Sequence, residues 1–476
     1  MRRPVHWLIS TALAVLVCSA AIGCSRVVNH ESPAKPNIVF ILADDMRYDD
    51  LKYMPKTRFL LGDGGMRFNH AYVSNALCCP SRATIMRGQY AHNTGVWTNI
   101  NGTDGGWKGY RYNGDEQDNL ATRLHAAGYK TALLGKYLND YRNTTVVPPG
   151  WDKWFAVFEP PVEYFNYDVN SNGQLRHFGT GESDYLTDVL SRQTQQFISA
   201  SVAQGKPFFA YVAPPAPHHP LTPAPRDEHT YDGLKAPRPP SFNEADVSDK
   251  PPWIRQLPRL SDRAKAEVNG RFEKRLETLQ ALDNLVEGVV NTLWDSGQLN
   301  NTYIVFTSDN GVFRGEHRLP AGKAEPYEED VRVPLLIRGP DVQAGSTTNK
   351  LVLNTDYFPT FTDLAGIRTP SYVDGRSLKP ILKGATPSTW RTAILLEYRH
   401  TREGGQTPSY YGIRTSDGMK YIEYKGGFRE LYNLNRDPYE LANSYDATAP
   451  PKSLGKRLAA LKSCSGDSCR AAENGP

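Results

Sequence analysis

The 476-residue sequence lacks a strong imbalance of charge. It contains 55 lysines and arginines against 51 aspartates and glutamates, so the formal net charge at pH 7 is only +4. No segment concentrates the basic residues into a patch. Proteins that bind nucleic acid neutralise its phosphates with clustered Lys and Arg side chains. We therefore expect no nucleic-acid partner.

Long apolar runs are also scarce, and the clearest one lies in the first 24 residues. Residues 8–17 are almost wholly apolar, follow Arg2 and Arg3, and precede the small residues of Ala21-Ile22-Gly23-Cys24. The run is too short and ends too abruptly for a membrane-spanning helix. The pattern is typical of a secretory signal peptide over residues 1–24. Residues 25–36 are polar and contain two prolines, which predicts a tether.

The cysteine that ends this leader has two interpretations. Cys24 directly after small residues resembles a bacterial lipobox, in which this cysteine becomes the lipidated first residue of the mature protein. Ala21 is less usual than Leu at its position, and ordinary secretion with cleavage between Ala20 and Gly23 is the alternative. Whether Cys24 carries lipid stays open. In both cases we expect an exported bacterial protein, either secreted or held at the cell surface by a lipid anchor at Cys24 as its one membrane contact.

Cysteine is sparse, and most of the six residues can be assigned from their positions. Cys18 lies in the leader. Cys464 and Cys469 are close enough in the chain to close a small loop through a disulfide. Cys78 and Cys79 are adjacent and have no evident partner. An unpaired vicinal pair in an exported protein calls for a chemical reason.

Beyond residue 36 the apolar runs are short, rich in β-branched residues and interleaved with helical stretches. This pattern predicts an α/β fold with a mostly parallel sheet. A strand over residues 333–337 is closed by Gly339-Pro340. Four other strands are followed by polar clusters: residues 37–42 by Asp44-Asp45, 131–134 by Gly135-Lys136, 208–212 by Pro217-His218-His219, and 303–307 by Ser308-Asp309-Asn310-Gly311. Because open α/β sheets build their sites at the carboxyl ends of strands, we expect these clusters to meet.

The chain is long enough for one large α/β domain and a smaller second unit. We expect the large domain over residues 37–375 and a C-terminal subdomain over 376–476. Residues 271–296 have apolar residues at helical spacing, and the proline-rich stretch 214–258 predicts a surface excursion that rims the site. The expected strands of the subdomain are residues 392–398, 411–415 and 421–424, the last two forming a hairpin around Asp417-Gly418.

Two of the polar clusters supply only oxygen ligands. Asp44, Asp45, Asp309 and Asn310 offer the carboxylate and amide oxygens that Ca²⁺ and Mg²⁺ prefer, whereas zinc more often recruits His or Cys. Taken alone, an Asp-Asp pair after a strand is more often a turn or a helix cap. Two such clusters together with a cysteine motif favour one Ca²⁺, with Mg²⁺ as the alternative.

That motif is Cys78-Cys79-Pro80-Ser81-Arg82. Cys-x-Pro-Ser-Arg is the signature at which sulfatases have a cysteine oxidised to formylglycine; the alternative is two buried or disulfide-bonded cysteines beside a turn. From about Pro36 to about Asn443 the chain resembles the sulfatase family, most closely its branch of N-acetylglucosamine-6-sulfatases and extracellular heparan endosulfatases. The segments that carry the resemblance are residues 74–82, 135–139, 215–218, 308–311, 430–434 and 437–438. The doubled cysteine and Gly-Lys-Tyr-Leu-Asn are features of that branch, and most other sulfatases have His where Leu138 stands.

The resemblance implies an alkaline-phosphatase-like three-layer α/β/α domain and a smaller C-terminal α+β domain with a short antiparallel sheet. It implies that a formylglycine-generating enzyme converts Cys78 to the nucleophile and that Arg82 holds the hydrated aldehyde. The residues implied to contact the sulfate are Lys136, His218 and Lys323. The residues implied to hold Ca²⁺ are Asp44, Asp45, Asp309, Asn310 and the modified Cys78.

The chemistry of a sulfate ester gives each of these roles a physical reason. The ester is an anion, so attack on its sulfur needs positive charge, which a divalent cation and two lysines supply. One hydroxyl of the hydrated aldehyde attacks sulfur to form a sulfo-enzyme, and the second then expels sulfate and restores the aldehyde. His218 is the expected general acid for the leaving sugar oxygen, and a loop histidine in a proline-rich turn is the alternative. The group that replaces the family histidine at Leu138 is left open between His219 and a nearby carboxylate.

Two other functions stay open from the sequence. A hydrolase of phosphate or phosphonate esters shares this fold and its metal chemistry, but such enzymes usually have Thr or Ser as nucleophile and further ligands for two zinc ions. A non-catalytic lipoprotein that binds sulfated glycans is the third reading. We expect a sulfated carbohydrate as substrate, 6-O-sulfated N-acetylglucosamine or a related glycan first. Terminal or internal cleavage and the oligomeric state are not determined.

Overall fold

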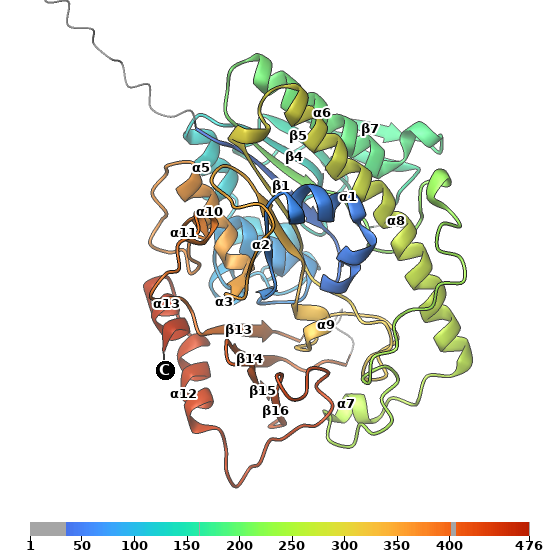
Figure 1. Ribbon diagram of the computed structural model, residues 1–476, viewed down its shortest axis with the longest axis vertical. Helices are drawn as coiled ribbons and strands as arrows, with labels where there is room; N and C mark the ends of the chain where they lie inside the picture. The colour runs from blue at the N-terminus through green and yellow to red at the C-terminus, as the bar shows by residue number, and fades with distance from the viewer. Residues whose placement is uncertain (1–34, 161, 401–405, 476) are drawn as a thin grey trace, which may run out of the picture. The chain divides into compact units, whose positions relative to one another are not determined.

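The computed structural model describes residues 35–160, 162–400 and 406–475, which are drawn in colour in Figure 1. The expected signal peptide, Cys24 and most of the expected tether therefore lie outside the described residues. Within the described part, no helix is both long enough and apolar enough to cross a membrane. Residues from Lys35 onward cluster as one unit. The predicted division at residues 375 and 376 stays a prediction.

A ten-stranded mixed sheet forms the centre of the fold, in the order β11-β2-β10-β9-β1-β8-β4-β5-β6-β7. The strands are β1 (Asn37–Ala43), β2 (Met66–Phe68), β4 (Lys130–Lys136), β5 (Lys153–Val157), β6 (Tyr167–Ser171), β7 (Gln174–Phe178), β8 (Phe208–Ala213), β9 (Thr302–Ser308), β10 (Leu335–Arg338) and β11 (Ser346–Thr348). The five central strands, β9 to β5 in this order, are parallel. A separate pair, β3 (Ala71–Tyr72) and β12 (Val352–Leu353), is parallel as well.

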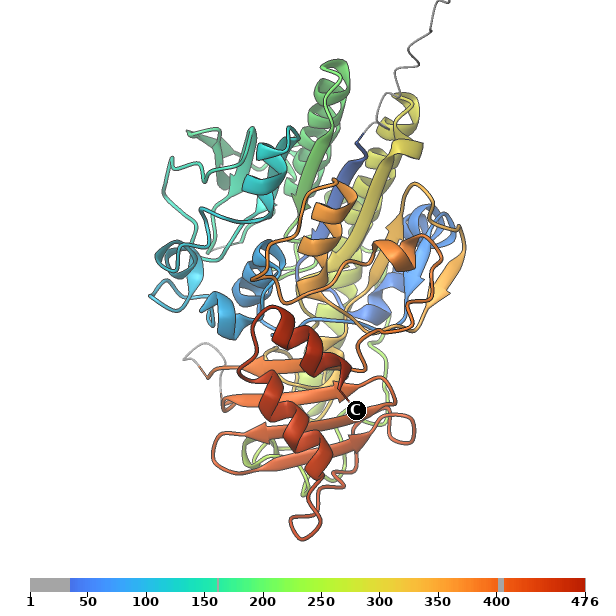
Figure 2. The same ribbon diagram turned by 90° about the vertical axis from the view of Figure 1, so that its left-hand side faces the viewer.

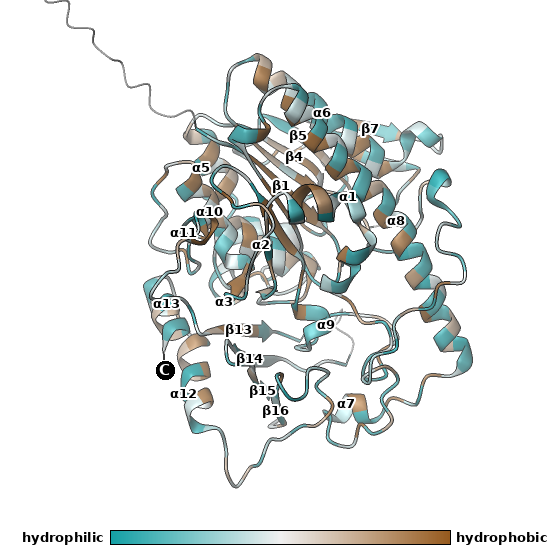
Figure 3. Cartoon of the chain, viewed as in Figure 1, coloured by the Kyte–Doolittle hydropathy of each residue, from teal (hydrophilic) through white to brown (hydrophobic). Residues whose placement is uncertain are grey.

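The sheet is buried on both faces, and its central strands are mostly apolar. All seven residues of β1 are buried. Ile38, Phe40 and Leu42 belong to one apolar core, whereas Val39 and Ile41 belong to the other. Successive side chains of a strand point to opposite faces, so a continuous apolar run requires cover on both sides. Figure 3 shows these strands in brown at the centre of the fold.

Helices cover the two faces and complete the expected three-layer α/β/α arrangement. The helices α6 (Leu186–Ala203) and α8 (Asp262–Asp295) pack on one core. The helices α2 (Cys78–Arg87), α5 (Leu120–Ala126) and α10 (Tyr357–Leu364) pack on the other. Figure 1 shows α6 and α8 together at the upper right and α5 and α10 at the left. The remaining helical segments are η1 (Tyr48–Tyr53), α1 (Pro55–Thr57), η2 (Arg58–Asp63), α3 (Ala91–Thr94), α4 (Gly106–Tyr112), η3 (Glu182–Asp184), η4 (Pro225–Asp227), α7 (Pro252–Arg255), η5 (Leu299–Asn301), α9 (Glu328–Val331), η6 (Asn354–Asp356) and α11 (Lys379–Leu382).

The predicted strands of the large sheet are all present, and one of them runs against the central parallel strands. The strand β10 is antiparallel to both of its neighbours, β9 and β2. The Gly339-Pro340 that follows it therefore lies at the opposite edge from the four polar clusters. The predicted helix over residues 271–296 matches the larger, C-terminal part of α8. This helix begins earlier, at Asp262, because the Ala264 amide donates to the Ser261 hydroxyl at 3.2 Å.

The C-terminal part contains the expected short antiparallel sheet. Its strands are β13 (Ala393–Tyr398), β14 (Tyr410–Thr415), β15 (Met419–Tyr424) and β16 (Arg429–Asn433), paired in chain order. The predicted hairpin around Asp417-Gly418 joins β14 to β15. In Figure 2 the helices α12 (Lys452–Leu461) and α13 (Asp467–Asn474) lie across this sheet. The predicted disulfide between Cys464 and Cys469 is present.

Candidate active site

The carboxyl ends of four central strands bring the predicted clusters to one edge of the sheet. The strand β1 leads into Asp44-Asp45, and β9 leads into Asp309-Asn310; the last residues of these two strands pair with each other. The strand β4 ends at Lys136, and β8 leads into the loop of His218. Because all four strands are parallel, their carboxyl ends lie at the same edge of the sheet. The structure thus assembles the site from segments far apart in the sequence.

Asp45 departs from the strand geometry and thereby turns two consecutive carboxylates toward one point. Its φ is 63°, in the left-handed region that a non-glycine residue rarely adopts. The Asp45 amide donates to Asp309 Oδ1 at 3.1 Å, and Arg275 donates to the Asp45 carbonyl at 2.7 Å. These bonds hold the conformation. The Cys78 thiol consequently lies 3.4 Å from Asp44 Oδ1 and 3.8 Å from Asp45 Oδ1.

Cys78 is the first residue of α2, which begins after the extended Leu77. Pro80 in the first turn needs no amide partner there, so it favours a helix start. The ammonium of Lys323 donates to the Cys78 sulfur at 2.7 Å. Burial first and the Asp44 carboxylate second raise the pKa of the Cys78 thiol well above its usual range. The thiol is therefore protonated.

Cys79 has a different environment. It is buried in the apolar core, and its amide donates to the Asn99 side chain at 2.9 Å. Burial raises the pKa of its thiol to about 12. No disulfide joins Cys79 to Cys78 or to any other described residue. Of the two adjacent cysteines, Cys78 alone contacts the carboxylates at the strand ends.

Two fully buried cations, Arg82 and Lys136, form ion pairs with these carboxylates. Arg82 lies one helical turn after Cys78, so it faces the same side of α2. Its Nε is 2.8 Å from Asp309 Oδ2, and its NH1 donates to the Lys136 carbonyl at 2.9 Å. The Lys136 ammonium is 2.6 Å from Asp44 Oδ2. Both cations thus neutralise aspartates of the predicted metal cluster.

A glycine directs Lys136 into this position. Gly135 has φ 117°, and a Cβ atom there would lie 2.1 Å from the Ala213 carbonyl oxygen on the adjacent strand. Only a residue without a side chain fits this close approach. The Gly-Lys pair is thus required by the backbone as well as by the chemistry of Lys136.

Burial and neighbouring charges set the protonation of the three aspartates. Burial raises the pKa of Asp44, but neighbouring cations, Lys136 first, outweigh burial and hold it well below its usual range. The pKa of Asp45 is lowered for the same reason, with Lys323 as the main cation. The pKa of Asp309 is raised, by burial first and by Asp44 second. The three carboxylates therefore repel one another.

The donor atoms fit a hard divalent cation. Oxygen, nitrogen and sulfur atoms of Asp44, Asp45, Cys78 and His218 lie within 4.8 Å of one another. The predicted ligand Asp309 is not part of this group, and His218, which was not predicted as a ligand, is. Asn310 donates to Asp45 Oδ1 at 2.7 Å, and its own buried Oδ1 has no hydrogen-bond partner among the described residues. Carboxylates and an amide oxygen are ligands of the kind that Ca²⁺ and Mg²⁺ take.

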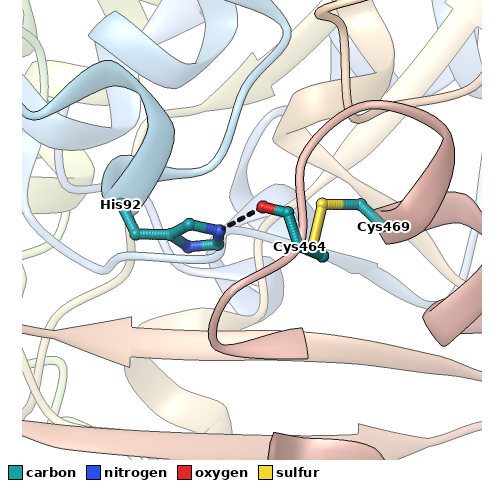
Figure 4. A group of neighbouring side chains, drawn as sticks. All are labelled: His92, Cys464 and Cys469. Atoms are coloured by element: carbon teal, nitrogen blue, oxygen red, sulfur yellow. Dashed lines mark hydrogen bonds between the residues drawn. A yellow bond between two sulfur atoms is a disulfide. The ribbon is translucent and has the colours of Figure 1, made fainter. Parts of the chain in front are cut away.

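A second group of potential ligands does not form a metal site. Figure 4 shows His92, Cys464 and Cys469 side by side, with the two sulfurs joined in a disulfide. These sulfurs cannot act as thiolates. Both nitrogens of the His92 ring have protein partners, Glu397 Oε2 at 2.8 Å and the Cys464 carbonyl at 2.9 Å.

A cavity of about 720 Å³ opens onto the strand ends. The residues that line it include Asp45, His218, His219, Leu221, Trp253, Leu257, Arg271, Phe272, Arg275 and Lys323. Five of these belong to the stretch 214–258, so the prediction that this stretch rims the site is confirmed. His218 Nε2 lies 3.8 Å from Asp45 Oδ2. His218 Nδ1 lies 2.6 Å from the His219 carbonyl, which can only accept, so Nδ1 carries a proton.

The structure adds two residues that the sequence analysis missed. The first is Glu159, whose carboxylate lies 2.9 Å from the Lys136 ammonium. Leu138, which stands where most sulfatases have His, is buried in the apolar core. Glu159 follows the end of β5, so the strand-end rule applied to that strand would have found it. Arg275 lies within the predicted apolar helix, and its sequence context gave no signal of a role at the site.

Comparison with known proteins agrees with this geometry. A family model described as Sulfatase matches residues 36–367, and one described as N-sulphoglucosamine sulphohydrolase, C-terminal, matches residues 315–463. The chain is 36% identical over 505 residues to an N-acetylglucosamine-6-sulfatase of Homo sapiens, covering 97% of this chain and 90% of the relative. It is 39% identical over 388 residues to an extracellular sulfatase SULF-1 homolog of Drosophila melanogaster, covering 80% of this chain and 34% of the relative.

A solved structure is similar over almost its whole length. It is described as bound to its substrate D-glucosamine-2-N,6-O-disulfate and has a TM-score of 0.79 and 27% identity to this chain. The similarity covers 92% of this chain and 99% of that one. The predicted fold class is thereby confirmed.

Proposed function

The chain belongs to the sulfatase family and is a sulfuric ester hydrolase, and from this premise we propose that it removes the 6-O-sulfate of N-acetylglucosamine or a related glucosamine in sulfated glycans. The observation that carries the proposal is the position of Cys78, whose sulfur lies between the carboxylates of Asp44 and Asp45 and the ammonium of Lys323. The relatives named for 6-sulfated N-acetylglucosamine and the neighbour bound to a 6-O-sulfated glucosamine support this substrate class.

The nucleophile that we propose is Cys78 after conversion to formylglycine. The hydrated aldehyde carries two hydroxyls on one carbon, where a cysteine has a single thiol. Arg82 lies on the same side of α2 as Cys78. Its buried Nη2 lies 3.6 Å from Asp44 Oδ2 and makes no hydrogen bond to any described residue. This unused donor supports the role of holding a hydroxyl of the hydrate. A formylglycine-generating enzyme is the partner required for maturation.

We propose that one Ca²⁺, or Mg²⁺ in its place, is held by Asp44, Asp45, Asp309, Asn310 and the oxygen of modified Cys78. When bound, the ion supplies Lewis-acid polarisation of the sulfuryl oxygens. The raised pKa of Asp309 and the unpartnered Asn310 oxygen support such a ligand set.

The remaining residues bind the ester and move protons. Lys136 and Lys323 present ammonium groups to the sulfuryl oxygens and stabilise charge that develops there. A hydroxyl oxygen of the hydrate releases its proton to water and bonds to sulfur as the bond between sulfur and the sugar oxygen breaks. His218, which lines the cavity with its Nε2 3.8 Å from Asp45 Oδ2, gives the sugar oxygen its proton. The second hydroxyl then loses its proton, the carbonyl reforms, and sulfate leaves.

We also propose that the protein acts outside the cytoplasm, as a secreted enzyme or a surface lipoprotein anchored at Cys24. The support is the leader pattern of residues 1–24 and the extracellular name of one relative. Metabolic labelling of intact cells with radiolabelled fatty acid distinguishes the anchored form, which should carry the label, from the secreted one. Cys24→Ala is the control.

The deciding experiment has two readouts. Peptide mass spectrometry should find Cys78 converted to an aldehyde when the protein is made with a formylglycine-generating enzyme. The converted protein should release sulfate from N-acetylglucosamine 6-sulfate faster than phosphate from the matching phosphate ester. Preference for the phosphate ester would replace the sulfatase proposal with the phosphohydrolase alternative.

A further inference from the structure

One face of α8 forms a wall of the catalytic cavity. The lining residues of this helix are Val268, Arg271, Phe272 and Arg275. Their spacing of three and four residues places them on a single face. Two of the four are cationic. Arg275 donates to the Asp45 carbonyl at 2.7 Å, so this wall begins directly beside the carboxylate cluster, and Arg271 lies one turn, about 6 Å, along the helix.

Arg275 is a buried cation without an ion-pair partner among the described residues. Its exposed fraction is 7%. In the part of the chain that the structure describes, each of the other buried arginines has a carboxylate within 4.0 Å, and Arg275 has none. Those other arginines are Arg47, Arg82, Arg314, Arg391 and Arg414.

Arg271, at the exposed end of the wall, likewise has no ion-pair partner among the described residues. Its guanidinium donates to the Pro320 carbonyl at 3.0 Å, and no described carboxylate lies within 4.0 Å of it. The other cations near the cavity are already engaged: Arg314 is paired with Asp50, and Lys323 contacts Asp45 and Cys78. Because a buried cation without an ion-pair partner is costly, an anion from the substrate is the natural partner of Arg275, and the exposed Arg271 is available to bind the same anion.

We propose that Arg275 and Arg271 form an anion subsite that binds a second anionic group of the glycan, a sulfate or carboxylate beyond the ester that is cleaved. This inference rests on the proposed function and specifies its substrate class as polyanionic glycans. The guanidinium fork suits both groups because it makes two parallel hydrogen bonds to sulfate or carboxylate oxygens. The second anion sits either on the same sugar or on its neighbour.

The test compares three substrates on the converted enzyme. N-acetylglucosamine 6-sulfate carries one anion, glucosamine 2-N,6-O-disulfate carries a second on the same ring, and a 6-sulfated disaccharide with a uronic acid carries it on the neighbour. The variants are Arg271→Gln and Arg275→Gln. The matched control is Arg263→Gln, on the exposed part of α8 outside the cavity lining.

We expect wild type to prefer at least one doubly anionic substrate over the singly anionic one in kcat/KM. Arg271→Gln should reduce this preference about tenfold, the usual size of a lost charge-assisted hydrogen bond, and Arg263→Gln should leave it unchanged. Arg275→Gln should reduce this preference at least as much. Because Arg275 also supports Asp45, the absolute kcat/KM of this variant can fall for that reason as well, so only the ratio of kcat/KM between substrates is compared. Equal kcat/KM on all three substrates in wild type, or a preference that survives in Arg271→Gln, would overturn the subsite.

Binding without turnover separates this inference from the proposed function. Calorimetry on Cys78→Ala protein should give tighter binding of the disulfate than of the monosulfate, and adding Arg271→Gln should remove the difference. If wild type fails to hydrolyse any 6-O-sulfate but this binding difference appears, the proposed function is wrong and the anion subsite stands. If hydrolysis occurs and the binding difference is absent, the subsite is wrong and the function stands.

Discussion

The carboxylate of Glu159 lies 2.9 Å from the ammonium of Lys136, and both side chains are buried. Asn139 donates to the same carboxylate oxygen at 2.8 Å, while Lys136 also reaches Asp44 at 2.6 Å. Lys136 is thus held between a carboxylate of the proposed metal cluster and one outside it. Leu138, at the position of the usual family histidine, is buried in the apolar core and cannot exchange protons. We propose Glu159 as the nearby carboxylate that the sequence analysis left open beside His219.

The first prediction concerns Glu159 as a positioning residue. Glu159→Gln keeps the size and the Asn139 contact but removes the charge that faces Lys136. We expect kcat to fall about tenfold, the value of one charge-assisted contact, with KM and the thermal unfolding midpoint nearly unchanged. The exposed Glu163→Gln serves as control and should leave kcat unchanged. A fall in the unfolding midpoint that parallels the loss of kcat would mean that Glu159 only supports the fold.

The second prediction separates the two adjacent cysteines. Cys78→Ala should abolish sulfate release and leave the unfolding transition intact, because alanine offers no oxygen nucleophile. Cys79→Ala should retain substantial activity, at a stability cost of about 1–2 kcal/mol for the lost buried sulfur. Steady-state kinetics and thermal unfolding on both variants provide the measurement. Activity that survives in Cys78→Ala but disappears in Cys79→Ala would refute the assignment.

The third prediction is that the metal stabilises the fold as well as the reaction. Chelation should abolish activity and lower the unfolding midpoint, because Asp44, Asp45 and Asp309 repel one another without a cation. At a free-metal concentration of about 100 times the Kd, a bound ion adds about 2.7 kcal/mol to the free energy of unfolding. Asp309→Asn should remove most of this metal dependence. Elemental analysis should find one Ca²⁺ or Mg²⁺ per chain, and two zinc ions would favour the phosphohydrolase reading.

The fourth prediction tests His218 as general acid. His218→Ala should lower kcat/KM for a 6-sulfated sugar by about a hundredfold or more, because a sugar alkoxide leaves poorly without a proton. An aryl sulfate has a better leaving group and should lose much less. His219→Ala, next to it in the same cavity, is the matched control and should affect both substrates weakly. An equal loss on sugar and aryl substrates in His218→Ala would remove the general-acid role.

The fifth prediction concerns pH and the contact shown in Figure 4. Burial lowers the pKa of His92, but Glu397 and the Cys464 carbonyl outweigh burial and raise it to about 9 from an ordinary value of 6.5. The group therefore contributes about 3 kcal/mol of stability below pH 6.5, and this contribution is lost as the pH rises toward 9. Denaturant unfolding of wild type and His92→Gln from pH 5.5 to 9.5 should show the two stabilities converging at high pH. A difference that stays constant with pH would exclude a protonated His92, and the exposed His229→Gln should show no difference.

Local sequence determined the features that depend on contiguous residues. The motif at residues 78–82, the strand ends at Asp44-Asp45 and Asp309-Asn310, and the Gly135-Lys136 pair could all be identified, because each is a short run with its own chemistry. The parallel central strands were equally clear, since a strand buried on both faces leaves an unbroken apolar run. These signals sufficed for the family, the fold class and the residues of the proposed site.

The tertiary structure alone decided the features that depend on residues distant in the chain. The direction of β10 follows from its pairing with β9 and β2, which its own apolar sequence does not encode. The left-handed conformation of Asp45 is held by Asp309 and Arg275 from two other segments. The roles of Glu159 and Arg275 depend on which charges lie beside them, and in both cases those neighbours come from other elements of the fold. A charge acts through space, so its partners become visible only when the chain is folded.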